Sequence, residues 1–103
     1  KELAPIIKLR LARVEASRGN IDQALSMIKD DIPENMASAY LEAKADFYML
    51  KEDKVSAYDY YTLAVNQLKD HDSPHVKILR LKLNKVTPKS LLKEDKDTTG
   101  DKN

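Results

Sequence analysis

Hydrophobic residues recur at steps of three and four along most of the chain, which is the spacing of amphipathic helices. The pattern predicts five helices, at about residues 4–18, 21–31, 34–50, 54–69 and 74–86. Their expected buried stripes are, in order, Leu3, Ile6, Ile7, Leu11 and Val14; Ile21, Leu25, Ile28 and Ile32; Met36, Tyr40, Ala43, Phe47 and Leu50; Tyr58, Tyr61, Val65 and Leu68; and Val76, Leu79, Leu83 and Val86.

One of these segments also fits a strand. From Ile78 to Leu83 apolar and basic residues alternate, and period two is typical of a half-buried strand. No partner strand is predicted elsewhere, and an isolated strand has nothing to pair with. The helix is therefore the stronger prediction.

Residues that start or stop helices separate the five segments. Gly19 can adopt the left-handed conformation that often ends a helix, and Asn20 follows it as an expected N-cap. Asp53 is the expected N-cap of the fourth helix. Ser73 followed by Pro74 is typical of an N-cap with proline at the first helical position.

The second and fourth helices open in a similar way. Residues 19–29, GNIDQALSMIK, resemble residues 52–66, EDKVSAYDYYTLAVN, and alignment on Ala24 and Ala57 gives a period of 33 residues. A period near 34 with a small residue in the second helix is the pattern of tetratricopeptide (TPR) repeats. The sequence therefore predicts an all-α, TPR-like fragment of an α-solenoid over residues 1–86, with two hairpins and a C-terminal capping helix. Residues 87–103 are polar and are expected to form a disordered tail.

In such a stack the first helices of successive repeats line a concave surface, where peptides usually bind. Positions 15 and 11 residues before the two aligned alanines, with the residues one turn on, give the candidate partner-binding residues Leu9, Arg13, Ala16, Glu42, Asp46 and Met49. Repeats that hold a C-terminal carboxylate carry Lys and Asn at the first-repeat positions. Because Leu9 and two acids stand in this set, no carboxylate clamp is predicted.

Composition narrows the classes of partner. The chain has 103 residues, 18 Lys and Arg against 17 Asp and Glu, and a net charge of +1. No overall positive field exists to hold a phosphate backbone, so no nucleic acid is expected as a partner. The absence of cysteine excludes disulfides and Cys-based zinc sites. No apolar run approaches the roughly 20 residues that span a bilayer.

The sequence offers two weak candidates for chemistry. His71 and His75 are four residues apart, but Ser73 and Pro74 mark a helix start between them, so a shared metal is not expected. Glu42 and Asp46 could form a carboxylate pair, but a solvated helix face is the simpler interpretation. The chain has no Gly-rich phosphate loop and no nucleophile motif, so neither an enzyme nor a cofactor is predicted.

Two surface features remain open. Five tyrosines, Tyr40, Tyr48, Tyr58, Tyr60 and Tyr61, could form a stacking platform, although core packing is favoured because three of them lie on the apolar stripes. The last helix carries a basic side, made of Lys77, Arg80, Lys82 and Lys85. This side could meet an anionic partner or lipid headgroups, or could simply be the solvated face of a capping helix.

A family resemblance adds to this interpretation. Residues 6–28, IIKLRLARVEASRGNIDQALSMI, and above all LRLARVE with the turn after it, resemble the YfgM family of ancillary SecYEG translocon subunits. The likeness continues more loosely through YLEAKADFYMLKEDKVSAYDYYTLAV and KILRLKLNKV, to about residue 86. The matching positions are expected to form the fold, not a mapped binding site: Leu11, Ala12, Arg13, Gly19, Ala24 and Ala57.

The resemblance also implies a cellular location and binding partners. Proteins of that family are bacterial, with one N-terminal transmembrane helix and a periplasmic TPR-like domain that associates with SecYEG and with chaperones such as PpiD. This chain has no such anchor, so it is expected to be the C-terminal part of a longer protein at the periplasmic face of the inner membrane. The alternative is a generic TPR adaptor in a cytosolic complex.

The small number of repeats predicts a further property. About three repeats are normally needed for a stable stack, and this chain has two and a cap. An apolar side near Leu3, Ile6 and Ile7 is therefore expected to be exposed and to favour a homo-oligomer.

Overall fold

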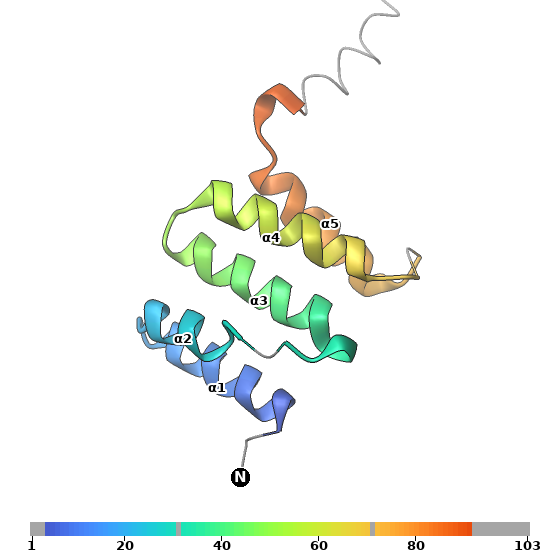
Figure 1. Cartoon of the computed structure of the whole chain (residues 1–103). Coiled ribbons are helices and arrows are strands. Elements are labelled where there is room, and N and C mark those ends of the chain that lie inside the picture. The colour runs from blue at the N-terminus through green and yellow to red at the C-terminus, as the bar shows by residue number, and fades with distance from the viewer. Residues whose placement is uncertain (1–3, 31, 71, 92–103) are drawn as a thin grey trace, which may run out of the picture.

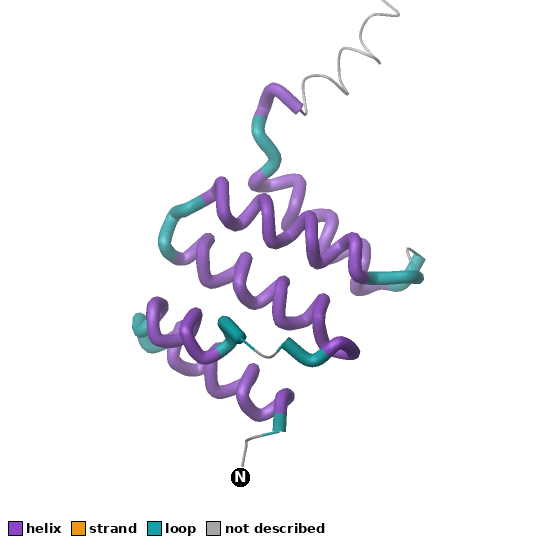
Figure 2. The backbone as a smooth tube through the Cα atoms, viewed as in Figure 1, coloured by secondary structure: helices purple, strands orange, loops and turns teal. Residues whose placement is uncertain are grey.

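The computed structural model describes residues 4–30, 32–70 and 72–91. All regular structure in these ranges is helical (Figures 1 and 2): α1 (Pro5–Ser17), α2 (Ile21–Met27), the 3-10 turn η1 (Glu34–Met36), α3 (Ala37–Leu50), α4 (Lys54–Gln67) and α5 (Pro74–Val86). The described residues contain no strand, so the competing strand prediction near Ile78 was wrong. None of these helices is long and apolar enough to cross a bilayer.

The helices form two hairpins and a fifth helix. α1 packs mainly on α2, α3 packs on α4, and α5 packs on α4. Figure 1 shows the α1–α2 pair below the α3–α4 pair, so the chain progresses from one end of the stack to the other. This arrangement confirms the predicted all-α fragment of helical hairpins.

Local chemistry explains three of the helix boundaries. Gly19, at φ 92°, follows α1 in a conformation that disfavours side chains with a Cβ. The carboxylate of Asp53 accepts a hydrogen bond from the Ser56 N–H, and the Ser73 hydroxyl caps α5 in the same way. Asn20 differs from the expectation, because its amide donates to Glu15 and does not cap α2.

Three boundaries differ from those expected. α2 ends at Met27, well before residue 31, and the following residues lead into η1 instead of directly into α3. Residues 89–91 are helical, with the Leu91 N–H bonded to the Pro88 carbonyl, which differs from the disordered tail expected from residue 87. Residues 92–103 lie outside the described part.

The core consists of two hydrophobic clusters. The first joins the α1–α2 hairpin to α3, and the second joins α3, α4 and α5. Ala24 and Ala57, the two aligned alanines, are both 0% exposed, one in each cluster. Their buried members are Leu9, Ala12, Ala16, Ala24, Ile28, Tyr40, Ala43 and Phe47 in the first cluster, and Ala45, Ala57, Tyr61, Ala64, Val65, Leu79 and Val86 in the second.

The buried face of α1 was predicted wrongly. Leu9, Ala12 and Ala16 face the core, because small side chains let α1 and α2 approach each other closely. The aliphatic residues assigned to the buried stripe are exposed instead: Ile6, Ile7, Leu11 and Val14. Leu3 lies outside the described residues. Apolar surface therefore remains at the α1 end of the stack, where self-association stays a prediction.

Candidate functional site

A series of ion pairs links the helices α1, α3 and α5. The Arg13 guanidinium on α1 lies 3.0 Å from the Asp46 carboxylate on α3. On the other side of Asp46, the Lys82 ammonium on α5 lies 3.3 Å from the same carboxylate. Asp46 therefore links α1 to α5, although these two helices belong to different ends of the stack.

Glu42, one turn before Asp46 on α3, extends this network. Its Oε2 accepts a hydrogen bond from Lys82 at 2.7 Å, and its Oε1 lies 2.8 Å from His75 Nε2. The Tyr61 hydroxyl on α4 also donates a hydrogen bond to Asp46. We call these six residues the α1–α3–α5 network: Arg13, Glu42, Asp46, Tyr61, His75 and Lys82.

Burial and charge together shift two pKa values in the network. Burial raises the pKa of the Tyr61 hydroxyl well above its ordinary value, and its hydrogen bond to Asp46 adds to the effect. For Lys82, burial acts to lower the pKa, but the hydrogen bond to Glu42 and the charge of Asp46 outweigh it, so the pKa is raised. Both shifts favour the protonated form of the group.

The raised pKa of Lys82 predicts a pH dependence. A group whose pKa is higher in the folded than in the unfolded state stabilises the fold below its ordinary pKa of 10.5, and this stabilisation is lost as the pH rises through the folded value. The difference in unfolding free energy between wild type and Lys82→Met should therefore be constant at neutral pH and shrink above pH 10.5. Urea unfolding followed by circular dichroism at several pH values measures it. A difference that grows with pH would contradict this assignment.

The structure brings together only part of the predicted partner-binding set. Arg13 and Asp46 pair with each other, and their side chains are 43% and 20% exposed. Met49 is half-buried against the second core cluster. Leu9 and Ala16 pack in the first core cluster, so their expected place on the exposed concave surface was wrong. Their positions fall on the side of α1 that contacts α2, which the 33-residue period alone could not reveal.

Glu42 also differs from the expectation. At 5% exposed it is the buried charged residue among those described, and its carboxylate is satisfied by Lys82 and His75. The solvated carboxylate face predicted for Glu42 and Asp46 was therefore wrong, because α5 covers it. The described residues hold no group of three potential metal ligands. The arrangement pairs charges across helices.

The predicted basic side of α5 is divided between two faces. Lys82 turns inward and belongs to the α1–α3–α5 network, so its place on an open basic surface was wrong. Lys77, Arg80 and Lys85 have exposed side chains. The division follows from the helical period, because Lys82 is three residues from Leu79 and four from Val86 and so borders the buried side of α5. Lys77 and Lys85 lie further round the helix, on its exposed side.

Sequence reasoning missed Tyr61 and His75 as members of the network. For His75 the sequence does contain a signal, which is the spacing between paired residues. Arg13 and Asp46 are 33 residues apart, and so are Glu42 and His75, which is the same period that relates Ala24 and Ala57. Polar side chains at equivalent positions of successive repeats therefore face each other across the stack. His75 is a hydrogen-bond partner of Glu42; His71 lies outside the described residues.

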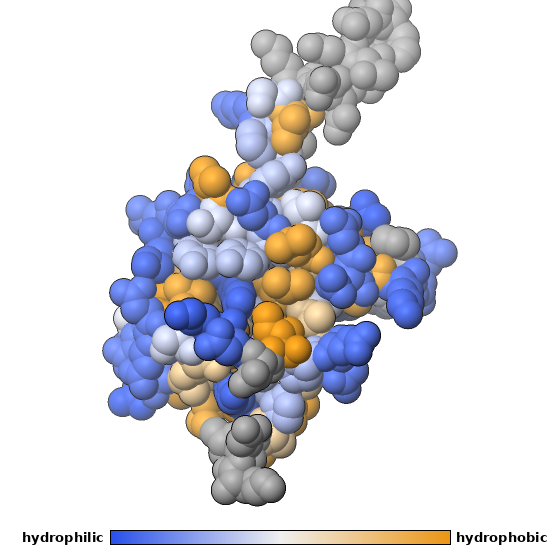
Figure 3. Space-filling model, viewed as in Figure 1, coloured by the Kyte–Doolittle hydropathy of each residue, from blue (hydrophilic) through white to orange (hydrophobic). Residues whose placement is uncertain are grey.

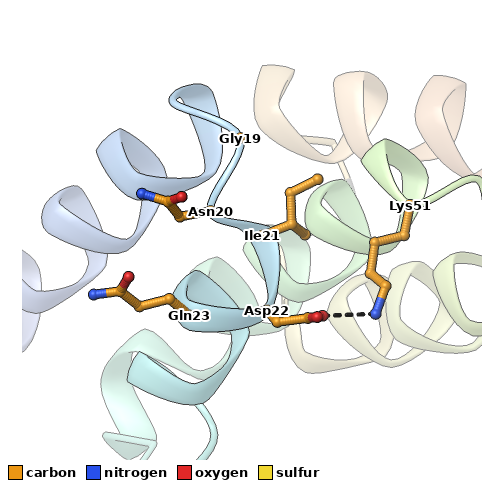
Figure 4. A pocket seen from close by; sticks show the side chains of 6 residues that line it. All are labelled: Gly19, Asn20, Ile21, Asp22, Gln23 and Lys51. Atoms are coloured by element: carbon orange, nitrogen blue, oxygen red, sulfur yellow. Dashed lines mark hydrogen bonds and ion pairs between the residues drawn. The ribbon is translucent and has the colours of Figure 1, made fainter.

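Two of the clefts formed by the described residues border α2 and lie away from the network. One, of about 420 Å³, is lined by residues 19–23 and by Lys51, whose ammonium pairs with the exposed Asp22 carboxylate at 2.7 Å (Figure 4). Exposed pairs of this kind contribute little to stability or binding.

The other cleft contains a tyrosine pair. The rings of Tyr48 and Tyr60 stack with centroids 5.5 Å apart, and the Lys44 ammonium lies 5.4 Å from the Tyr60 centroid. Burial lowers the pKa of Lys44, and Asp30 opposes the shift. Tyr40 and Tyr61 are in the core, so the tyrosines do not form one continuous platform.

The stacked hairpins, with their first helices joined across one face, define a helical-repeat scaffold of the kind that binds other proteins. The family model described as tetratricopeptide repeat-like domain matches residues 1–88, so the chain belongs to this family. A search of curated proteins found no match, and neither did a search of solved structures.

Proposed function

We propose that this domain is the periplasmic part of an ancillary translocon subunit that links SecYEG to periplasmic chaperones such as PpiD. Tetratricopeptide repeat-like domains generally mediate protein–protein interactions and are not enzymes, which supports the coarser part of this proposal. The resemblance of residues 6–28 to the YfgM family supports the finer part. In this proposal an N-terminal transmembrane anchor outside the present chain holds the domain at the periplasmic face of the bacterial inner membrane.

The observation that carries the interaction role is the shared face of α1, α3 and α5. Side chains from all three helices meet there, and Arg13 and His75 reach solvent while they pair with acids of α3. A partner can therefore contact three helices of the stack at once. Because the charges of this face are already paired, a partner must either match the whole network or displace one of its ion pairs.

Site-specific photocrosslinking in membranes tests the proposal. A photoreactive residue is placed in the full-length protein at Arg13 or His75, on the shared face, and at Asp59, an exposed position of α4, as the matched control. Arg13 and His75 are expected to give adducts with translocon subunits or a periplasmic chaperone, while Asp59 gives few.

Each other outcome contradicts part of the proposal. Adducts with cytosolic proteins alone would replace the translocon assignment with a generic TPR adaptor. Equal adducts from Asp59 and from the shared face would show that this face is not the working surface. Absence of envelope partners from every position would overturn the translocon role.

A further inference from the structure

The outer side of α5 is an exposed surface that the network does not use. Ile78 is 49% exposed and Leu81 is 64% exposed, whereas the opposite side of the helix is buried on α4. Lys77, Leu81 and Lys85 are spaced four apart and so lie on the same side as Ile78. A cleft at the end of the helix brings Val55 and Lys89 next to Lys85. We call these six residues, Lys77, Ile78, Leu81, Lys85, Val55 and Lys89, the α5 strip.

Charge is distributed unevenly around this strip. Residues 73–93 contain no acidic residue, although the whole chain is close to neutral at +1. The described residues provide no ion pair for Lys77, Lys85 or Lys89, in contrast to Lys82, which is held by Glu42 and Asp46. The α5 strip is therefore a locally positive surface with exposed aliphatic side chains, and it is complementary to an anionic surface.

The spacing of the aliphatic residues distinguishes two classes of partner. A docked helix is recognised by anchors at i, i+3 or i+4, and i+7. On α5 this register reaches Ile78 and Leu81 and then meets Lys85, so a helix would gain one turn of apolar contact. Val55 belongs to a different helix, α4.

A bilayer interface suits this arrangement better. Separate aliphatic side chains can each insert among lipid tails, while lysine stems extend so that their ammonium groups stay at headgroup level. Hydrophobic and hydrophilic residues are interleaved elsewhere on the molecule too, as Figure 3 shows for one face. The α5 strip differs because all of its charges have the same sign.

We propose that the α5 strip binds the surface of anionic phospholipid bilayers. The three lysines would provide electrostatic attraction, since each Lys near an anionic membrane contributes roughly a fivefold gain in affinity. Ile78, Leu81 and Val55 would add apolar insertion. This binding does not depend on the proposed translocon role, because it requires no protein partner.

Vesicle flotation tests the proposal with the whole chain. Vesicles of phosphatidylcholine with about 30% phosphatidylglycerol supply the anionic surface, and pure phosphatidylcholine is the neutral comparison. Binding is expected only to the anionic vesicles, and about 0.5 M NaCl should abolish most of it by screening. Lys77→Glu with Lys85→Glu should weaken binding by about tenfold or more. Ile78→Ser with Leu81→Ser should weaken it by about tenfold while leaving the charge intact.

The other end of the stack provides a matched control. Arg10→Glu with Leu11→Ser changes one exposed cation and one exposed aliphatic residue on α1. This variant should bind the anionic vesicles like wild type, and circular dichroism shows whether each variant is folded. Absence of binding at low salt, equal binding to neutral vesicles, or an equal loss in the α1 variant would overturn the proposal. Capture of an acidic amphipathic peptide by the strip without vesicle binding would also overturn it, in favour of a protein partner.

Discussion

Replacement of Phe47 by alanine should lower the free energy of unfolding by about 3–5 kcal/mol. Phe47 is 2% exposed and belongs to the cluster that joins the α1–α2 hairpin to α3. Removal of the ring leaves a cavity between two hairpins that share few other contacts. Because a domain of this size is stable by about 5–15 kcal/mol, this single change should remove a large share of the total.

Urea unfolding followed by circular dichroism measures the effect of Phe47→Ala. Leu50→Ala is the matched control, because Leu50 lies on the same helix but is 55% exposed, although the sequence pattern placed it on the buried stripe. Its cost should stay below about 0.5 kcal/mol. Similar losses for the two variants would show that the first cluster does not hold the hairpins together.

Glu42→Ala should cost about 3 kcal/mol, the lower end of the range for removing one partner of a buried ion pair. The substitution leaves the Lys82 ammonium without its 2.7 Å partner in a half-buried place and removes the contact with His75. Asp46 still neutralises Lys82 in part, and the Lys82 and His75 side chains both retain access to water, so the loss stays at this lower end.

A double variant separates lost pairing from lost packing at this position. Glu42→Leu with Lys82→Met replaces the ion pair with apolar side chains and should recover much of the stability lost in Glu42→Ala. Asp59→Ala, an exposed acid on α4, is the control for loss of one negative charge and should be nearly neutral. Equal costs for Glu42→Ala and Asp59→Ala would show that the network does not stabilise the stack.

The sequence predicts the repeat architecture well, because the features that determine it are local. Ala24 and Ala57 allow close helix approach in both hairpins, and both are completely buried. Asp53 and Ser73 cap helices with side chains that act within three residues. The positive φ of Gly19 is likewise a local feature, because glycine at that one position can adopt this conformation without strain.

The buried face of α1 could not be predicted in the same way, because both sides of this helix carry apolar residues. Hydrophobicity favours Ile7 and Leu11, whereas close packing on α2 selects Ala12 and Ala16. A choice between the two faces depends on the neighbouring helix. The end of α2 at Met27 was not predicted either, because the hydrophobic pattern up to residue 32 remains helical.

The candidate site lies between these cases. The 33-residue period identifies Arg13, Glu42 and Asp46 as residues of one face, but it does not show that α5 covers the acids. The covering of the acids depends on contacts with Lys82. This residue is 36 positions from Asp46 and 40 from Glu42, so neither spacing matches the 33-residue period. Sequence reasoning therefore placed these three residues on one face but did not predict how they pair.

The two residue pairs that are 33 positions apart also restrict which repeat can follow which in the stack. Arg13 faces Asp46, and Glu42 faces His75, each across one repeat. A tandem duplication of residues 37–69 would place Asp46 opposite a second Asp46 and Glu42 opposite a second Glu42. Like charges at such short separations repel strongly when partly buried. The repeats of this domain are therefore not interchangeable modules, and its length cannot grow by simple copying of its own second repeat.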